Sequence, residues 1–124
     1  MGLTYFKRFR MEYDLRHGVP ASVPVPLGYD LVPYSADLIR DHATAKFHSF
    51  RCELDANVFP CLGRRDGCLR LMREITSRAG FVPQATWLCR YRDSDSGTMQ
   101  PIGTIQVLQF EGWVAVQNLG IDPG

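Results

Sequence analysis

One histidine and three cysteines in this sequence are spaced so that their side chains could act together in chemistry. His48 and Cys52 stand four residues apart, which places them on one face of a helix, and Cys61 and Cys68 follow. Such a set is a candidate for binding a metal ion. Its spacing does not match the short-paired motifs of zinc sites, so buried thiols and a partly exposed histidine are the favoured interpretation. We therefore predict no metal site.

A group of arginines is the second chemical candidate, because guanidinium groups bind phosphate. Carboxylates recur among these arginines at helical spacing, which favours a solvated, salt-bridged helix face. No aromatic residue is interleaved to stack a base, and the formal net charge is only +1. We therefore expect no nucleic-acid partner. The arginines are Arg64, Arg65, Arg70, Arg73 and Arg78.

The composition is that of one soluble globular domain. The chain has 124 residues, of which 45% are hydrophobic and 22% charged, and this length is sufficient for a core. No apolar stretch approaches the ~20 residues that a membrane-spanning helix needs, so we expect no membrane partner. The four cysteines lack close CxxC pairing, which is typical of reduced thiols in a cytoplasmic protein.

The first third of the chain predicts two strands joined by an unusual segment. Residues 4–15 alternate between apolar and charged side chains, the period of a half-buried strand. Residues 17–28 hold three prolines and two glycines, a composition that favours an extended linker or arm. A second short strand is predicted over Tyr29 to Pro33.

The middle of the chain predicts two helices. From Leu38 to Leu54, apolar residues recur at spacings of three and four and form one stripe, which we expect to pack on a sheet. The residues of this stripe are Ile39, Ala43, Phe47, Phe50 and Leu54. The second helix is predicted from Asp66 to Arg78, with Gly80 as its C-cap.

Three strands are predicted in the last third of the chain, at 85–93, 101–110 and 113–121. Turn-rich residues separate the first two, and Glu111-Gly112 separates the last two. Short connections of this kind give an antiparallel meander. The predicted fold is therefore α+β, a mostly antiparallel, twisted sheet with two helices packed on it.

The order of these elements resembles the N-terminal half of a GNAT-superfamily N-acetyltransferase. GYDLVPYSADL at 28–38 resembles that family's opening strand and helix start, GTIQV at 103–107 its third strand, and VQNLGIDP at 116–123 its fourth. In the family the fourth strand runs through an apolar-x-apolar-x-Pro ending, here Leu119, Ile121 and Pro123, into a loop of the form Arg/Gln-x-x-Gly-x-Gly/Ala. The sequence given stops at Gly124, before such a loop.

The resemblance implies transfer of an acyl group from acetyl-CoA, the cosubstrate, to an amine. In the family, unpaired backbone groups of the fourth strand bind the pantetheine arm, and one N–H polarises the thioester carbonyl. By position these groups belong to Asn118, Leu119, Gly120 and Ile121. Glycine inside a strand independently marks a bulge or the close approach of another backbone, although a plain core strand with a tolerated glycine is an equal alternative.

The resemblance also implies a base and a wall for the acceptor, a small-molecule or peptide amine. Many members use a glutamate on the fourth strand, where this chain has Gln117 and Asn118. These amides would hold a water, or the base comes from Glu53 or from beyond residue 124. The segment between the helices would wall the acceptor site through Phe50, Glu53, Asn57 and Phe59. For each residue taken singly, core packing or a solvated face is the simpler interpretation.

The last strand supports a second hypothesis, a non-catalytic binding or dimerisation module. Ending the sheet at this strand exposes the edge of Val114 to Ile121, which would pair with a second copy in a homodimer. On the first hypothesis, successive N–H groups of the family's loop hold the pyrophosphate of acetyl-CoA. A polypeptide of residues 1–124 is therefore expected to bind acetyl-CoA weakly or not at all.

Overall fold

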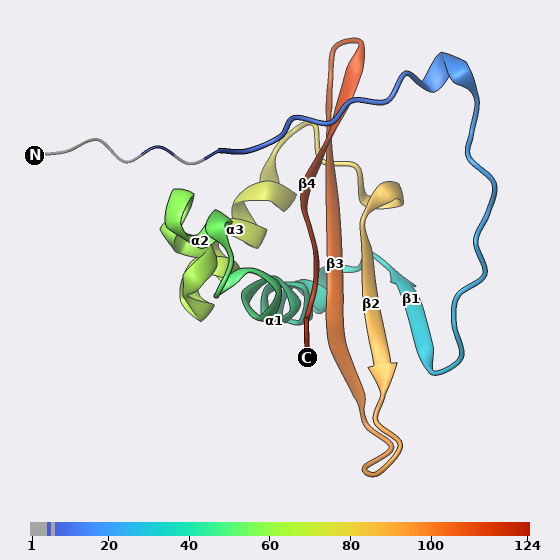
Figure 1. Cartoon of the computed structure of the whole chain (residues 1–124), viewed down its shortest axis with the longest axis vertical. Helices are drawn as coiled ribbons and strands as arrows, with labels where there is room; N and C mark the ends of the chain where they lie inside the picture. The colour runs from blue at the N-terminus through green and yellow to red at the C-terminus, as the bar shows by residue number, and fades with distance from the viewer. Residues whose placement is uncertain (1–4, 6) are drawn as a thin grey trace, which may run out of the picture.

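The protein folds as an antiparallel sheet with helices on one face, as Figure 1 shows. The structure is a computed structural model that describes residue 5 and residues 7–124. Four strands pair in the order β1-β2-β3-β4, each antiparallel to its neighbour. The predicted α+β class and the antiparallel sheet are therefore confirmed. The strands are β1 (Tyr29–Pro33), β2 (Trp87–Arg92), β3 (Met99–Phe110) and β4 (Trp113–Ile121).

The predicted strand at 4–15 is wrong for the residues that the structure describes. Residues 5 and 7–14 form no strand, and Leu15–His17 is a 3₁₀ turn. The apolar side chains of the alternation are solvent-exposed, Phe9 to 84% and Met11 to 92%. An alternating pattern makes a strand only where a neighbour supplies a hydrogen-bonding ladder and a core. The residues that follow include three prolines, which have no backbone N–H to donate to a ladder.

The proline-rich residues 17–28 form the predicted arm. In Figure 1 the arm descends on the β1 side of the molecule and turns into that strand. Val23 to Pro26 line a pocket of about 260 Å³ on the sheet face opposite the helices. The residues of the sheet that line the same pocket are Tyr29, Leu31, Cys89, Ile102 and Ile121.

The first predicted helix is divided in two. α1 spans Ile39–Phe50 after a 3₁₀ turn, η2 (Ala36–Leu38), and α2 spans Leu54–Val58. Glu53 has extended backbone and precedes α2, so Leu54 leaves the apolar stripe and is 41% exposed. A further 3₁₀ turn, η3 (Pro60–Gly63), then leads to α3 (Arg65–Ser77), close to the predicted second helix.

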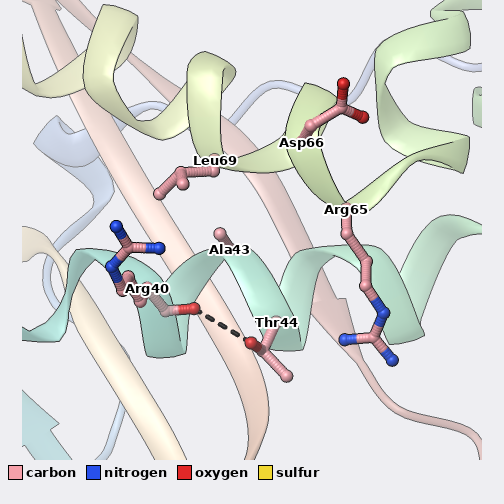
Figure 2. Close-up of a pocket in the computed structure, with 6 residues that line it drawn as sticks. All are labelled: Arg40, Ala43, Thr44, Arg65, Asp66 and Leu69. Carbon is pink, nitrogen blue, oxygen red and sulfur yellow. Dashed lines mark hydrogen bonds between the residues drawn. The ribbon is translucent and has the colours of Figure 1, made fainter.

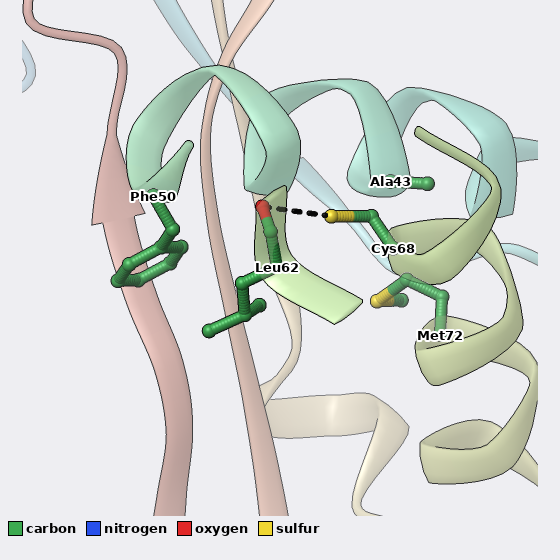
Figure 3. Close-up of a cluster of buried hydrophobic side chains, with 5 residues drawn as sticks. All are labelled: Ala43, Phe50, Leu62, Cys68 and Met72. Atoms are coloured by element: carbon green, nitrogen blue, oxygen red, sulfur yellow. Dashed lines mark hydrogen bonds between the residues drawn. The ribbon is translucent and has the colours of Figure 1, made fainter. Parts of the chain in front are cut away.

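The apolar stripe of α1 faces mainly other helices, and Phe50 also contacts the sheet at Gly120 of β4. Ala43 and Phe50 of α1 form a buried cluster with Leu62 of η3 and with Cys68 and Met72 of α3 (Figure 3). α1 packs on the sheet as predicted, but mostly through another face than its apolar stripe. The face of α1 that meets the sheet carries His42, Ala45, Lys46 and Ser49, all buried.

The three C-terminal strands form the predicted meander. β2 and β3 are joined through a turn that includes Gly97, and β3 and β4 through Glu111 and Gly112, with φ of 73° and 80° at the two glycines. Gly80 is not the C-cap of α3, which is Arg78. Gly80 instead lets its backbone lie close to β3, because a Cβ there would lie 2.4 Å from the carbonyl oxygen of Gln109. A short 3₁₀ turn, η4 (Pro83–Ala85), precedes β2. None of the described helices combines the length and the apolar character of a membrane-spanning segment.

Candidate functional site

The last strand is an edge of the sheet and contains a β-bulge. Thr104 pairs with Gly120 and Gln106 with Gln117, so Ile105 alone faces both Asn118 and Leu119. Asn118 has a φ of 48°, in the left-handed region that asparagine tolerates better than most residues. A bulge re-aims backbone and side chains and interrupts the ladder. The bulge thus lies within the residues 118–121 that the sequence singled out.

Gly120 sits where α1 presses against β4. A Cβ at this position would lie 2.7 Å from both the Phe50 ring and the Ser49 Cβ. Gly120 is therefore required by a close approach, as the sequence indicated, but its neighbours here are side chains of a helix. This contact fixes the C-terminal end of α1 beside the bulge.

The structure brings together only part of the predicted site. Leu119 and Ile121 are exposed, to 63% and 56%, on a strand whose outer edge has no partner strand in the described residues. Gln117 is half-buried opposite Gln106. The side chain of Asn118 turns inward and accepts a hydrogen bond from Lys46, so this residue reaches the open edge through its backbone.

Of the residues predicted to wall the acceptor site, only Phe50 contacts β4 beside the bulge, and the others belong to the α2 segment. Phe50 is 8% exposed and packs against Gly120 as part of the core. Glu53 and Asn57 are exposed residues of the α2 segment. Phe59, also exposed, lies under the guanidinium of Arg8, 5.2 Å from the ring centre, and Arg8 pairs with Asp55 at 3.3 Å. Glu53, Asn57 and Phe59 are thus available to solvent, as a wall requires.

A buried polar cluster between α1 and the sheet was missed by the sequence analysis. Lys46 Nζ lies 2.6 Å from Gln106 Oε1 and 3.0 Å from Asn118 Oδ1. His42 Nδ1 lies 2.8 Å from Thr104 Oγ1, and this oxygen accepts a hydrogen bond from Gln106 Nε2. His42, Lys46, Thr104 and Gln106 are all buried. We call His42, Lys46, Thr104, Gln106 and Asn118 the polar cluster.

Two patterns of polar residues in the sequence correspond to parts of the polar cluster, although neither predicts the cluster by itself. His42, Lys46 and Ser49 recur at helical spacing, as a second stripe beside the apolar one. Thr104 and Gln106 alternate within an otherwise apolar strand and so share one face of it. Polar residues in both patterns read as solvent-exposed when each element is considered alone. Only the packing of α1 on β3 shows that the two stripes meet.

Burial suppresses charge in the polar cluster. It lowers the pKa of Lys46 to about 7, although the nearby thiols of Cys68 and Cys61 favour the charged amine. Burial, and then the charge of Lys46, lower the pKa of His42 to about 4. His42 Nε2 is buried without a hydrogen-bond partner among the described residues. His42 is therefore uncharged at pH 7, whereas Lys46 is close to its titration midpoint and is protonated in only part of the molecules.

A second pocket, of about 320 Å³, lies between α1 and α3 (Figure 2). Its floor is Ala43 and Leu69, and Arg40, Arg65 and Asp66 border it. The Arg65 guanidinium lies over the Phe47 ring, 4.7 Å from its centre, and 3.2 Å from His48 Nε2. The other arginines that were considered as a phosphate-binding group are also exposed. They are distributed along α3 and at its two ends: Arg64, Arg70, Arg73 and Arg78.

The histidine and cysteines do not assemble a metal centre. His48 Nδ1 lies 3.6 Å from an Asp122 oxygen, and all four cysteines are free thiols. No group of three His, Cys, Asp or Glu side chains that could hold a metal ion occurs in residue 5 and residues 7–124. Cys52 is exposed, whereas burial raises the pKa of the Cys68 thiol to about 11.

The candidate site is thus the open edge of β4 at its bulge, backed by the buried polar cluster. The outer edge of β4 carries backbone N–H and C=O groups that no strand among the described residues pairs with, and exposed apolar side chains flank them. Such an edge can bind an extended ligand or another strand through main-chain hydrogen bonds. No protein-family model, curated protein or solved structure matches this chain.

Proposed function

We propose that this chain is the N-terminal part of an acyl-CoA-dependent N-acyltransferase, in which the bulged edge of β4 binds the pantetheine arm of acetyl-CoA. The observation that carries the proposal is the bulge itself. It stands at Asn118 and Leu119, on an edge strand, within the residues for which the GNAT resemblance implies backbone binding of the cosubstrate.

The geometry of the edge suits an extended amide-containing chain. Pantetheine carries two amides, which can exchange hydrogen bonds with a strand edge as a neighbouring strand would. The exposed side chains of Leu119 and Ile121 offer apolar surface beside the backbone. A bulge N–H that is not committed to the ladder is the kind of donor that can polarise a thioester carbonyl.

The reaction would form an amide bond between the acceptor nitrogen and the acyl carbon, and break the bond from that carbon to sulfur. The acceptor amine must lose a proton to attack. Asn118 cannot accept that proton, and its side chain is bonded to Lys46. Among the candidates from the sequence, Glu53 is a carboxylate that remains exposed to solvent beyond the end of α1. The acceptor is a small-molecule or peptide amine.

The coding sequence provides the first test of this proposal. We expect the reading frame to continue past codon 124 and to encode, within a few residues, a loop of the form Arg/Gln-x-x-Gly-x-Gly/Ala. Such a loop would hold the pyrophosphate through successive backbone N–H groups and a helix N-terminus. A frame that ends at codon 124, or that continues without such a loop, would contradict the proposal.

The exposed side chains of β4 favour a second candidate, a module that associates through this edge. Trp113, Val114 and Val116 are 55%, 47% and 57% exposed, and an edge strand with such side chains invites pairing with a second copy. The mass of the protein by sedimentation equilibrium separates the two candidates. A dimer that dissociates when Val116→Lys is introduced supports association through β4, whereas a monomer at high concentration excludes it.

A further inference from the structure

Lys46 is the least expected residue in the core. It is fully buried, and uncharged amides are its hydrogen-bond acceptors, Gln106 on β3 and Asn118 on β4. The titratable groups that face it from the packed elements are His42 of α1, Cys61 of η3 and Cys68 of α3. Within the described chain, no carboxylate pairs with its amine.

The hydrogen bonds of the polar cluster suit a neutral amine. A neutral lysine has two N–H groups, which match the oxygens of Gln106 and Asn118. A charged lysine has a third N–H, for which the described residues supply no further acceptor. Gln106 then donates through Nε2 to Thr104 Oγ1, and Thr104 lies within hydrogen-bond distance of His42 Nδ1. The donors and acceptors of this chain are consistent with an uncharged Lys46 at one end and an uncharged His42 at the other.

The bond to Asn118 connects this network to the open edge. The Asn118 side chain points inward to Lys46 while its backbone adopts the left-handed conformation at the bulge. A side chain held at a fixed point restricts the backbone from which it extends. We propose that Lys46 is the positioning residue of the β4 bulge, fixing Asn118, and with it the backbone groups of Asn118 and Leu119, through its two hydrogen bonds.

This role makes the bulge sensitive to pH. A proton added to Lys46 leaves a charge in a buried site with no counter-ion, which is costly. The structure can relieve that cost by opening the contact between Lys46 and Asn118 to water, and the bulge then loses its anchor. Because burial lowers the pKa of Lys46 to about 7, the change falls within the physiological range.

The sequence makes the protonation of Lys46 directly measurable. Lys7 and Lys46 are the only lysines, so lysine labelled with ¹³C at Cε gives two NMR signals, and a Lys7→Arg variant identifies each. We expect the Lys46 signal to titrate with a midpoint near pH 7. The backbone amides of Asn118, Leu119 and Gly120 should follow the same midpoint in a ¹⁵N spectrum.

Two variants test whether the coupling runs through the proposed hydrogen bond. Lys46→Gln keeps two N–H donors and cannot titrate, so the pH dependence of the bulge amides should disappear. Asn118→Gly keeps the left-handed backbone accessible and removes the acceptor, so Lys46 should still titrate while the remaining bulge amides no longer follow it. If either variant fails to fold, the wild-type titration still tests whether the bulge amides follow the protonation of Lys46.

The inference would be overturned by a Lys46 midpoint above pH 9, or by bulge amides that ignore the Lys46 titration. A lysine that only fills space in the core would produce the second result. A role of the bulge in binding acetyl-CoA rests on the proposed function, but these titrations are carried out without any ligand. A failure of the proposed function therefore leaves them readable, and their failure leaves the proposed function open.

Discussion

Replacing Gly120 by valine is expected to lower the free energy of unfolding by roughly 3 kcal/mol, the upper range for overpacking a core. A Cβ at this position would lie 2.7 Å from the Phe50 ring and 2.7 Å from the Ser49 Cβ. Valine favours strands, but that preference spans only about 1 kcal/mol and does not offset a contact of this kind. Urea denaturation monitored by tryptophan fluorescence measures the change.

Two controls show whether the loss comes from the contact with α1. Gly63→Ala places a Cβ 3.7 Å from the Ala56 Cβ, an ordinary van der Waals distance, and should cost less than about 1 kcal/mol. Phe50→Leu combined with Gly120→Ala should be less destabilising than the sum of the two single changes, because the smaller side chain vacates the contested space. Strict additivity would mean that α1 does not press on β4 as described.

The free energy of unfolding should rise by about 1.5 kcal/mol between pH 7 and pH 8.5 because of Lys46 alone. Burial lowers the pKa of Lys46 from 10.5 to about 7, so in this window the unfolded chain binds more protons than the folded one. Stability then increases with pH, with a slope that approaches ~1.4 kcal/mol per unit. Below about pH 7 both states carry the proton, and the full cost of the buried charge remains.

Other titrating groups of the core act outside this window. The pKa of His42 is lowered from 6.5 to about 4. The unfolded chain therefore binds this proton first, and the free energy of unfolding falls as the pH falls from 6.5 towards 4. The pKa of Cys68 is raised from 9.0 to about 11, so it destabilises the fold only above about pH 9. Denaturation of Lys46→Gln should show the rise between pH 7 and 8.5 removed, and Lys7→Gln should retain it. An unchanged rise in Lys46→Gln would show that another group causes it.

The sequence predicted the elements whose patterns are local. The meander of β2, β3 and β4, the short strand β1 and α3 all follow from alternation, turn residues or helical spacing, and each lies close to its predicted bounds. The segment at 4–15 has an equally clear alternation, but its described residues, 5 and 7–15, pair with no strand. Alternation specifies which side chains share a face, whereas a ladder requires a partner that local sequence does not name.

The candidate site was predictable only in part, for a related reason. Gly120 in an apolar strand marks a close approach, and Asn118 is a residue type that tolerates the left-handed backbone of a bulge. The anchor of that bulge is Lys46, which is separated from Asn118 by 72 residues and belongs to a residue type that is rarely buried. Neither helix pattern nor strand pattern indicates that these two side chains meet.

The most direct test of the account is an acetyl-CoA titration monitored through the backbone amides of Asn118 to Ile121. On the proposed function, residues 1–124 alone would supply acetyl-CoA with about two or three backbone hydrogen bonds of about 1 kcal/mol each, against an association cost of at least ~4 kcal/mol. For this polypeptide we expect no saturable shift at micromolar ligand. The product of the whole reading frame, with the predicted pyrophosphate loop, should bind at micromolar concentration, with its largest shifts at these four amides. Saturable shifts in residues 1–124 would show that the β4 edge binds acetyl-CoA without the loop. Binding by the whole product with these four amides unchanged would contradict the assignment of the β4 bulge as the pantetheine site.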